Sequence, residues 1–220
     1  MQPLLIRHAL PVPSANGGGA DPGLSELGLR MAERLPDALR RHHVSRIVSS
    51  PQLRARQTAQ PLAGSLDLAV EVDERLAEYD YGLAEYVPVE QMRAEDPLQF
   101  ARLVSGQLPD GVDADAFKAR VTAAADHLIS TAGRHARVAV FGHGGVINVL
   151  LQRALGTPRL FPCAMDYVSV SHLRYSAGNE PTVLGVNNIE HVWDLLPRLN
   201  KIPPEGKAVD SPRSSNVRLA

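Results

Sequence analysis

The sequence has very little cysteine and no excess of charge of either sign. Cys163 is the only cysteine among 220 residues, which excludes a disulfide framework and any metal site built from several cysteines. With 23 Lys and Arg against 24 Asp and Glu, the net charge of -1 supplies no overall field for nucleic acid or an anionic membrane. We therefore expect neither as a partner, and any bound anion must be held by a local cluster of cations.

Long apolar runs are absent as well. No stretch approaches the ~18 residues of a membrane-spanning helix, and the apolar run at residues 3–6 is too short for a signal peptide. We expect a cytoplasmic protein with one domain over residues 1–200, whose 44% hydrophobic residues suffice for a core. Residues 201–220 are rich in Pro, Ser and charge, and are expected to form an irregular tail or to pack on a partner.

Short apolar strands alternate with amphipathic helices along the chain. Strands are predicted at 3–6, 46–50, 68–72 and 137–141, and later at 167–175 and 181–186 around a turn at 177–179. Helices are predicted at 25–39 with Ser25 as the cap, at 51–62, at 113–129 and at 146–155. This alternation is typical of an α/β protein, and we predict a three-layer α/β/α sandwich with a mostly parallel sheet.

Residues 79–112 interrupt the alternation, and we predict a small inserted lid with helical pieces there. Three prolines punctuate the segment: Pro88, Pro97 and Pro109. Three tyrosines lie near its start: Tyr79, Tyr81 and Tyr86. These rings either line the entrance to a binding site or pack within the lid, and the sequence leaves both open. Tyr79 and Tyr81, together with Met92 and Phe100, favour a small or moderately apolar ligand.

Unusual polar residues follow three of the predicted strands. Arg7 and His8 follow the first strand, Arg54 comes just after the second, and His143 follows the strand at 137–141. Ligands of open α/β sheets bind beyond the carboxyl ends of the strands, so these side chains should converge. Arginine binds phosphate oxygens in a bidentate manner, and the backbone at Gly144 adds N–H donors at a helix start. Neutral imidazole beside guanidinium groups can also attack phosphorus, which indicates phosphate chemistry.

Five segments, in order, resemble the histidine phosphatase superfamily, which contains cofactor-dependent phosphoglycerate mutases and many small phosphatases. The segments are 5–9 (LIRHA), 24–28 (LSELG), 49–59 (SSPQLRARQTA), 75–82 (RLAEYDYG) and 141–145 (FGHGG). A single Arg-His pair would be weak support, because such a pair at a strand end is usually a surface feature. Five ordered segments across most of the predicted catalytic domain are a specific match.

The resemblance implies a role for each matching residue. His8 matches the nucleophile that becomes phosphorylated, and Glu78 matches the acid that protonates the leaving oxygen and then activates water. Arg7, Arg54 and His143 match the groups that hold the phosphoryl oxygens. The implied activity is hydrolysis of a small-molecule phosphomonoester through phosphohistidine, with no metal and no cofactor. Members of the family often dimerise, so the resemblance also implies a homodimer.

Departures from the mutases favour hydrolysis. The run Glu-Ser-x-x-Asn that follows the nucleophile in mutases is absent, although Asn16 is a candidate to reach a phosphate. Residues 83–86 contain none of the basic residues with which mutases clamp their substrate. Ala9 stands where Gly is most common, and we expect its methyl group beside the pocket. A phosphoglycerate mutase is the alternative function, and a phosphoester-binding module without turnover is a third.

Other chemically suggestive residues have simpler explanations. Asp113 and Asp115 superficially resemble an aspartyl-phosphate motif, but they follow a Pro-Gly loop, which predicts a helix cap. Cys163 has no arginine six residues further on, which argues against a cysteine-based phosphatase. The remaining histidines lack a motif and are expected to be structural or exposed: His42, His43, His127, His135, His172 and His191.

Overall fold

The computed structural model describes residues 1–13, 20–176 and 180–197. Its strands are β1 (Gln2–Arg7), β2 (Arg46–Ser49), β3 (Val70–Val72), β4 (Arg137–Gly142), β5 (Val170–Tyr175) and β6 (Pro181–Asn188). Its α-helices are α1 (Glu26–Ala32), α2 (Leu35–Leu39), α3 (Leu53–Leu66), α4 (Val89–Glu95), α5 (Pro97–Val104), α6 (Ala114–Thr131) and α7 (Gly144–Leu155). Short 3-10 helices are η2 (Arg40–His42), η3 (Glu74–Leu76) and η4 (Glu190–Leu195). The predicted turn at 177–179, the tail at 201–220 and Asn16 lie outside the described residues.

The six strands form one sheet in the order β3-β2-β4-β1-β5-β6. Strands β3, β2, β4 and β1 are parallel to one another, whereas β5 runs antiparallel to both β1 and β6. The predicted α/β fold with a mostly parallel sheet is therefore confirmed, with an antiparallel edge formed by the two late strands. The register places Arg7 of β1 opposite Gly142 of β4, so the residues that follow these strands leave the sheet side by side.

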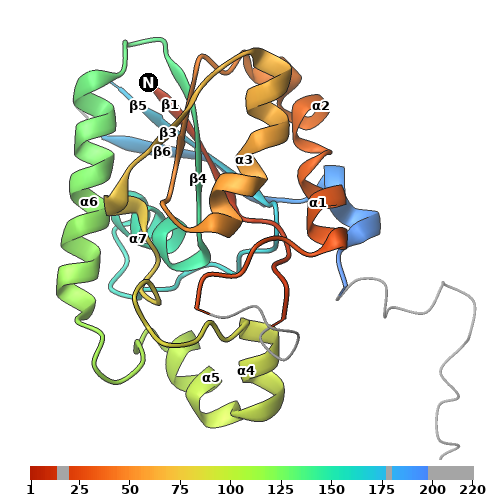
Figure 1. The fold of residues 1–220 in the computed structure, drawn as a ribbon. Helices are drawn as coiled ribbons and strands as arrows, with labels where there is room; N and C mark the ends of the chain where they lie inside the picture. The colour runs from red at the N-terminus through yellow and green to blue at the C-terminus, as the bar shows by residue number, and fades with distance from the viewer. Residues whose placement is uncertain (14–19, 177–179, 198–220) are drawn as a thin grey trace, which may run out of the picture.

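Helices cover both faces of the sheet, with α6 and α7 on one side and α1, α2 and α3 on the other (Figure 1). Successive side chains of a strand point to opposite faces. Leu5 of β1 accordingly packs in the core under α6 and α7, while Leu4 and Ile6 pack in the core under α1, α2 and α3. The central strands are buried on both faces, which explains why they appear as short continuous apolar runs in the sequence.

The prediction of a single helix at 25–39 is wrong, because the structure has two helices there, α1 and α2. Ser25 does cap α1, since its Oγ accepts a hydrogen bond of 3.0 Å from the Gly28 backbone. A side chain at Gly28 would collide with the carbonyl oxygen of Leu10, which explains the glycine there. The break follows from Pro36 in the first turn of α2, because proline has no N–H to continue the α-helical bonding.

The segment at 79–112 contains the predicted helical pieces, α4 and α5. Asp96 begins α5, because its side chain accepts a hydrogen bond of 2.9 Å from the Gln99 backbone and Pro97 occupies the first turn. The two helices lie beyond the end of the sheet, at the bottom of Figure 1. We propose that this segment acts as a lid over the site described below.

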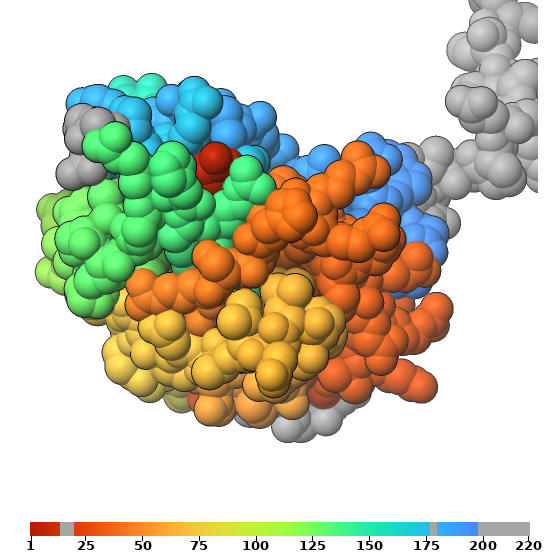
Figure 2. Space-filling model, turned by 90° about the horizontal axis from the view of Figure 1, so that it is seen from above, coloured from red at the N-terminus to blue at the C-terminus, as the bar shows by residue number. Residues whose placement is uncertain are grey.

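The opposite end of the sheet is seen in Figure 2, where the red start of the chain lies in a hollow between green and blue segments. The Met1 ammonium group donates to the carbonyl oxygens of Arg134, at 2.7 Å, and Tyr175. Strand β1 is thus flanked by other elements along its whole length, and its far end delivers Arg7 to the interior. No helix in the described part of the chain is both long and apolar enough to cross a bilayer.

Candidate active site

His8 lies directly after β1 and is only 3% exposed. Its Nδ1 is 2.8 Å from the carbonyl oxygen of Ala9. Because a carbonyl oxygen only accepts hydrogen bonds, Nδ1 carries the proton of the neutral ring and Nε2 keeps its lone pair. Burial lowers the pKa of His8 well below its usual value, and the charges of Arg54 and Arg7 lower it further. The ring is therefore neutral at pH 7, with a nucleophilic nitrogen available.

The expectation for Ala9 is wrong. Its methyl group does not line the cavity beside His8 but packs, fully buried, in the core under α1, α2 and α3. The Ala9 backbone N–H donates to Thr58 Oγ1 at 2.9 Å, which ties the residue to α3. The core beside His8 therefore accommodates the alanine side chain.

Each of the two predicted phosphate-binding arginines is stacked on a tyrosine. The guanidinium carbon of Arg7 lies 4.0 Å from the centre of the Tyr167 ring, and that of Arg54 lies 4.2 Å from the Tyr86 ring. Arg54 is also paired with Asp80, whose Oδ2 accepts a hydrogen bond of 2.8 Å. Stacking fixes a guanidinium plane and leaves its edge free to donate. Both arginines are thus held rigidly, with N–H groups available for a ligand.

Several buried nitrogens around His8 have no hydrogen-bond partner in the described residues. They are Arg7 Nε, Arg54 Nε and Nη1, and His143 Nδ1. The Asp21 carboxylate lies 3.7 Å from Arg54 Nη1, which is an ion-pair distance and too long for a hydrogen bond. Buried polar groups without partners are costly, so a cluster of them indicates a ligand that presents several oxygens at once. A phosphoryl group has that shape and charge.

His143 follows β4 and is the N-cap residue of α7. Its Nε2 is 2.7 Å from Ser50 Oγ, and its ring centre is 5.2 Å from that of His8. Burial lowers the pKa of His143 well below its usual value, and Arg54 and His8 add to the effect. The structure therefore brings His143 against His8, as the parallel pairing of β1 and β4 requires.

Glu78 lies in the same cavity, after η3. Its Oε2 accepts a hydrogen bond of 2.7 Å from the Gly145 backbone, and its Oε1 accepts one of 3.0 Å from the Tyr79 backbone. Burial raises the pKa of Glu78 to about 7, and nearby Asp80 contributes, whereas the two backbone donors and Arg54 oppose the rise. A side chain at Gly145 would collide with this carboxyl group. The carboxyl group can hold or release a proton near neutral pH, as a general acid and base requires.

Two polar residues that fix the site were missed as functional residues, although both lie within the segment 49–59. Ser50 is the partner of His143 described above. Gln52 is 1% exposed and connects the two acidic residues of the site. Its Oε1 accepts from the Glu78 backbone N–H, and its Nε2 donates to Asp80, both at 2.7 Å. The sequence carries one signal for Gln52: it is a polar residue that directly follows Pro51, just after a buried strand.

Arg120 was also missed, and no local signal could have revealed it. It lies on the amphipathic helix α6, where an arginine is typically solvated. Its guanidinium group instead donates to the backbone carbonyls of Arg75 and Ala77, both at 2.8 Å, and reaches that of Glu78 at 3.5 Å. Arg120 therefore holds the segment that carries Glu78.

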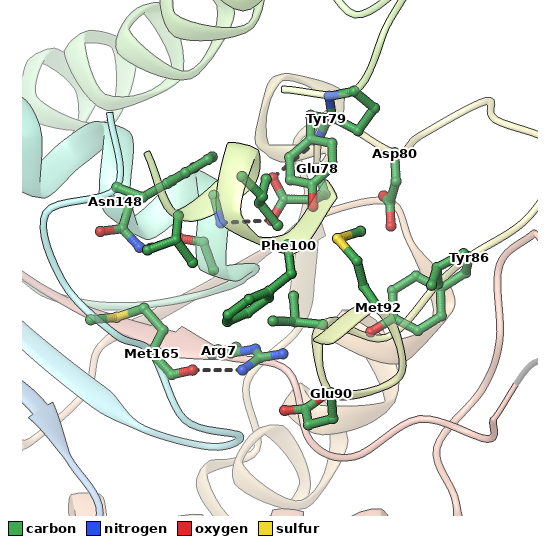
Figure 3. A pocket seen from close by; sticks show the side chains of 18 of the residues that line it. Arg7, Glu78, Tyr79, Asp80, Tyr86, Glu90, Met92, Phe100, Asn148 and Met165 are labelled. Carbon is green, nitrogen blue, oxygen red and sulfur yellow. Dashed lines mark hydrogen bonds between the residues drawn. The ribbon is translucent and has the colours of Figure 1, made fainter. Parts of the chain in front are cut away.

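A cavity of about 350 Å³ extends from the phosphate-binding groups toward α4 and α5 (Figure 3). Most of its wall is apolar and includes Tyr79, Tyr86, Met92, Phe100, Leu103 and Met165. Tyr79 and Tyr86 therefore line the cavity, and so does Gly144. Tyr81 does not, because it is 53% exposed and its hydroxyl group faces Glu74. The segment at 79–112 thus contributes apolar side chains to the wall of the cavity, and Tyr81 is not among them.

The residues to which the sequence analysis assigned no catalytic role lie outside the phosphate site. Asp113 caps α6, with Oδ1 accepting hydrogen bonds of 2.9 Å from the backbones of Asp115 and Ala116. Cys163 lines the outer cavity and is a free thiol. None of the six remaining histidines lines the cavity.

Comparison with known families decides where this arrangement belongs. The model of the histidine phosphatase superfamily (branch 1) matches residues 4–189, nearly the whole described chain. The chain belongs to this superfamily.

The proteins that this chain resembles are named both as a mutase and as phosphatases. The "Probable phosphoglycerate mutase GpmB" of Yersinia pestis (strain Pestoides F) is 28% identical over 182 residues, covering 76% of this chain and 84% of the relative. The mycobacterial glucosyl-3-phosphoglycerate phosphatase is 26% identical and superposes with a TM-score of 0.71 over 84% of this chain and 98% of that one. The α-ribazole phosphatase of Shigella flexneri shares the fold, at 23% identity and a TM-score of 0.67 over 86% of this chain and 96% of that one.

Proposed function

We propose that this protein hydrolyses small-molecule phosphomonoesters through a phosphohistidine formed at His8. The observation that carries the proposal is a set of buried, unpartnered nitrogens of Arg7, Arg54 and His143 gathered around a neutral His8. Those nitrogens match the oxygens of a phosphoryl group, and Glu78 supplies a proton beside them.

In the first step, Nε2 of His8 attacks phosphorus while the bond between phosphorus and the ester oxygen breaks. Arg7, Arg54 and His143 hold the phosphoryl oxygens and stabilise the charge that they carry in the transition state. Protonated Glu78 gives its proton to the leaving oxygen, so the alcohol departs neutral. The products are the alcohol, phospho-His8 and the Glu78 carboxylate.

In the second step, water replaces the alcohol. The Glu78 carboxylate takes a proton from the water as its oxygen attacks phosphorus, and the bond between phosphorus and Nε2 breaks. Inorganic phosphate leaves, His8 is again neutral and Glu78 is again protonated. Glu78 therefore loses one proton to the alcohol and regains one from water in each cycle, so it ends each turnover in the form in which it began.

The cavity favours hydrolysis over mutase chemistry. A phosphoglycerate mutase must hold a substrate that carries a carboxylate as well as a phosphate. In the described residues, the cationic side chains that line the cavity are Arg7 and Arg54, and both face the phosphate position. The resemblance to GpmB keeps the mutase as the second candidate, and phosphoester binding without turnover as a third.

The test is phosphate release from an aryl phosphate by the wild type and by His8→Ala, with EDTA present. We expect the wild type to release phosphate in EDTA, and His8→Ala to lose roughly a thousandfold or more in kcat/KM. The matched control is His127→Ala, which removes a histidine outside the cavity and should leave the rate unchanged. Loss of wild-type activity in EDTA would contradict the assigned chemistry.

The same experiment separates the other candidates when 3-phosphoglycerate is assayed alongside. Isomerisation of 3-phosphoglycerate without net phosphate release would identify a mutase. Tight binding of phosphoesters with neither reaction would identify a binding module.

A further inference from the structure

The charged groups around the cavity leave no cation for the organic part of a substrate. Two arginines line the cavity in the described residues, and both belong to the phosphate site. Four acidic residues line it: Glu78, Asp80, Glu85 and Glu90. Glu78 is the proposed acid and Asp80 is paired with Arg54. The remaining two carboxylates give the outer cavity a negative character.

Glu90 is the carboxylate held close to the phosphate site. It lies in the first turn of α4, and its Oε2 accepts a hydrogen bond of 2.7 Å from the Tyr167 hydroxyl group. Tyr167 is in turn stacked on Arg7, so the carboxylate is connected to the phosphate-binding group through one ring. Figure 3 shows Glu90 and Arg7 facing the same cavity.

The rest of the wall around Glu90 is apolar. Met92, Phe100 and Met165 surround the space next to Arg7 (Figure 3), and Leu103 and Phe161 extend the same surface. An apolar alcohol is stabilised there because it removes these side chains from water. A carboxylate in the same place would lose part of its hydration and would face Glu90, while Arg7 and Arg54 are engaged by the phosphoryl group.

We infer that the cavity selects phosphate monoesters whose leaving alcohol is apolar and uncharged, and that Glu90 is the specificity-determining residue that rejects acidic alcohols. This inference rests on the proposed function, because it concerns the alcohol whose phosphate is removed at His8. It also explains physically why a phosphoglycerate would be a poor substrate for this chain.

The test compares kcat/KM for three alkyl esters with similar leaving groups: 3-phenylpropyl phosphate, 3-phosphoglycerate and phosphoethanolamine. For the wild type we expect the apolar ester to exceed 3-phosphoglycerate by roughly tenfold or more, as expected for like charges meeting near a protein surface. In Glu90→Gln the ratio of the two should fall about tenfold, because the amide still accepts from Tyr167 but carries no charge.

The matched control is Glu95→Gln, which removes the same charge from the other end of α4, outside the cavity. It should leave the ratio unchanged. An unaltered ratio in Glu90→Gln, or a wild type that prefers 3-phosphoglycerate, would overturn the inference. A preference for phosphoethanolamine would also overturn it, since Glu90 would then bind a cation.

Binding measured in parallel keeps this inference separate from the proposed function. The dissociation constants of 3-phenylpropylphosphonate and of a phosphonate that carries a carboxylate are compared by calorimetry for the same variants. If no ester is turned over, the proposed function fails. The dissociation constants still test the selectivity of the cavity in that case. Tighter binding of the apolar phosphonate by the wild type, with a smaller preference in Glu90→Gln, would support the inference, and equal ratios in the two proteins would contradict it.

Discussion

Glu78 owes its two proposed roles, as acid and as base, to its surroundings. Burial and the neighbouring Asp80 raise its pKa to about 7, while the backbone N–H groups of Tyr79 and Gly145 hold both carboxyl oxygens in place. An ordinary glutamate would be ionised at pH 7 and could not give a proton to a leaving group. The raised pKa leaves enough of the acid form for the first step and enough carboxylate for the second.

The protonation of Glu78 predicts a pH dependence and a dependence on the leaving group. Since its pKa is raised, the acid form persists up to about pH 7 and is lost above it, so kcat/KM for an alkyl phosphate should fall above about pH 7. Glu78→Gln should lower kcat/KM for an alkyl phosphate roughly a hundredfold or more. An aryl phosphate should lose much less, because its leaving group needs little protonation.

The control for this prediction is Glu74→Gln, an exposed glutamate of the same segment. It should preserve both rates and the pH profile. Equal losses for alkyl and aryl esters in Glu78→Gln would remove Glu78 from the acid role.

Among the elements, the parallel pair β1 and β4 assembles the centre of the site. Because Arg7 is in register with Gly142, the residues that follow, His8 and His143, emerge next to each other. This convergence is predictable from the sequence, since parallel strands end at the same edge. The same reasoning correctly brings Arg54, at the start of α3 after β2, to this edge.

Elements whose partners are distant in sequence could not be predicted in the same way. Arg120 belongs to an unremarkable amphipathic helix, and its partners are backbone carbonyls more than forty residues earlier. The division of the first helix into α1 and α2 was signalled by Pro36, but the apolar spacing continued across it. The exposure of Tyr81 and the burial of Ala9 depend on tertiary packing, which periodicity does not encode.

Substitution of Arg120 should affect the position of Glu78, because Arg120 connects two elements. It is a positioning residue that connects α6 to the segment bearing Glu78, so Arg120→Gln should loosen the acid without touching the phosphate site. We expect kcat/KM to fall more for an alkyl than for an aryl phosphate, together with a loss of ~1–3 kcal/mol in the free energy of unfolding.

Arg34→Gln is the matched control, because Arg34 forms an exposed ion pair with Asp194 away from the cavity. It should change neither the ratio of the two rates nor the free energy of unfolding by more than ~1 kcal/mol. Equal losses for both esters in Arg120→Gln would indicate general destabilisation and no role in positioning Glu78.

At the scale of the whole molecule, the end of the sheet carries the proposed phosphate site, and the segment at 79–112, the proposed lid, supplies much of the wall of the cavity next to it. The fold class followed from the alternation of strands and helices, and the order of the five segments indicated the family. The cavity could not be predicted, because its wall combines α4, α5 and residues near 161–165, which meet only after folding. The charge of that wall, and with it the selectivity assigned to Glu90, required the structure.

The central claim is that His8 becomes phosphorylated during turnover, and trapping the phosphoenzyme tests it most directly. The wild type is mixed with 3-phenylpropyl phosphate, quenched in alkali after milliseconds and analysed by peptide mass spectrometry. Phosphohistidine is expected on the peptide that contains His8, and Glu78→Gln, mixed with an aryl phosphate, should accumulate more of it because the attack of water is slowed. Rapid phosphate release with no phosphoryl group on His8 at any time would contradict the account.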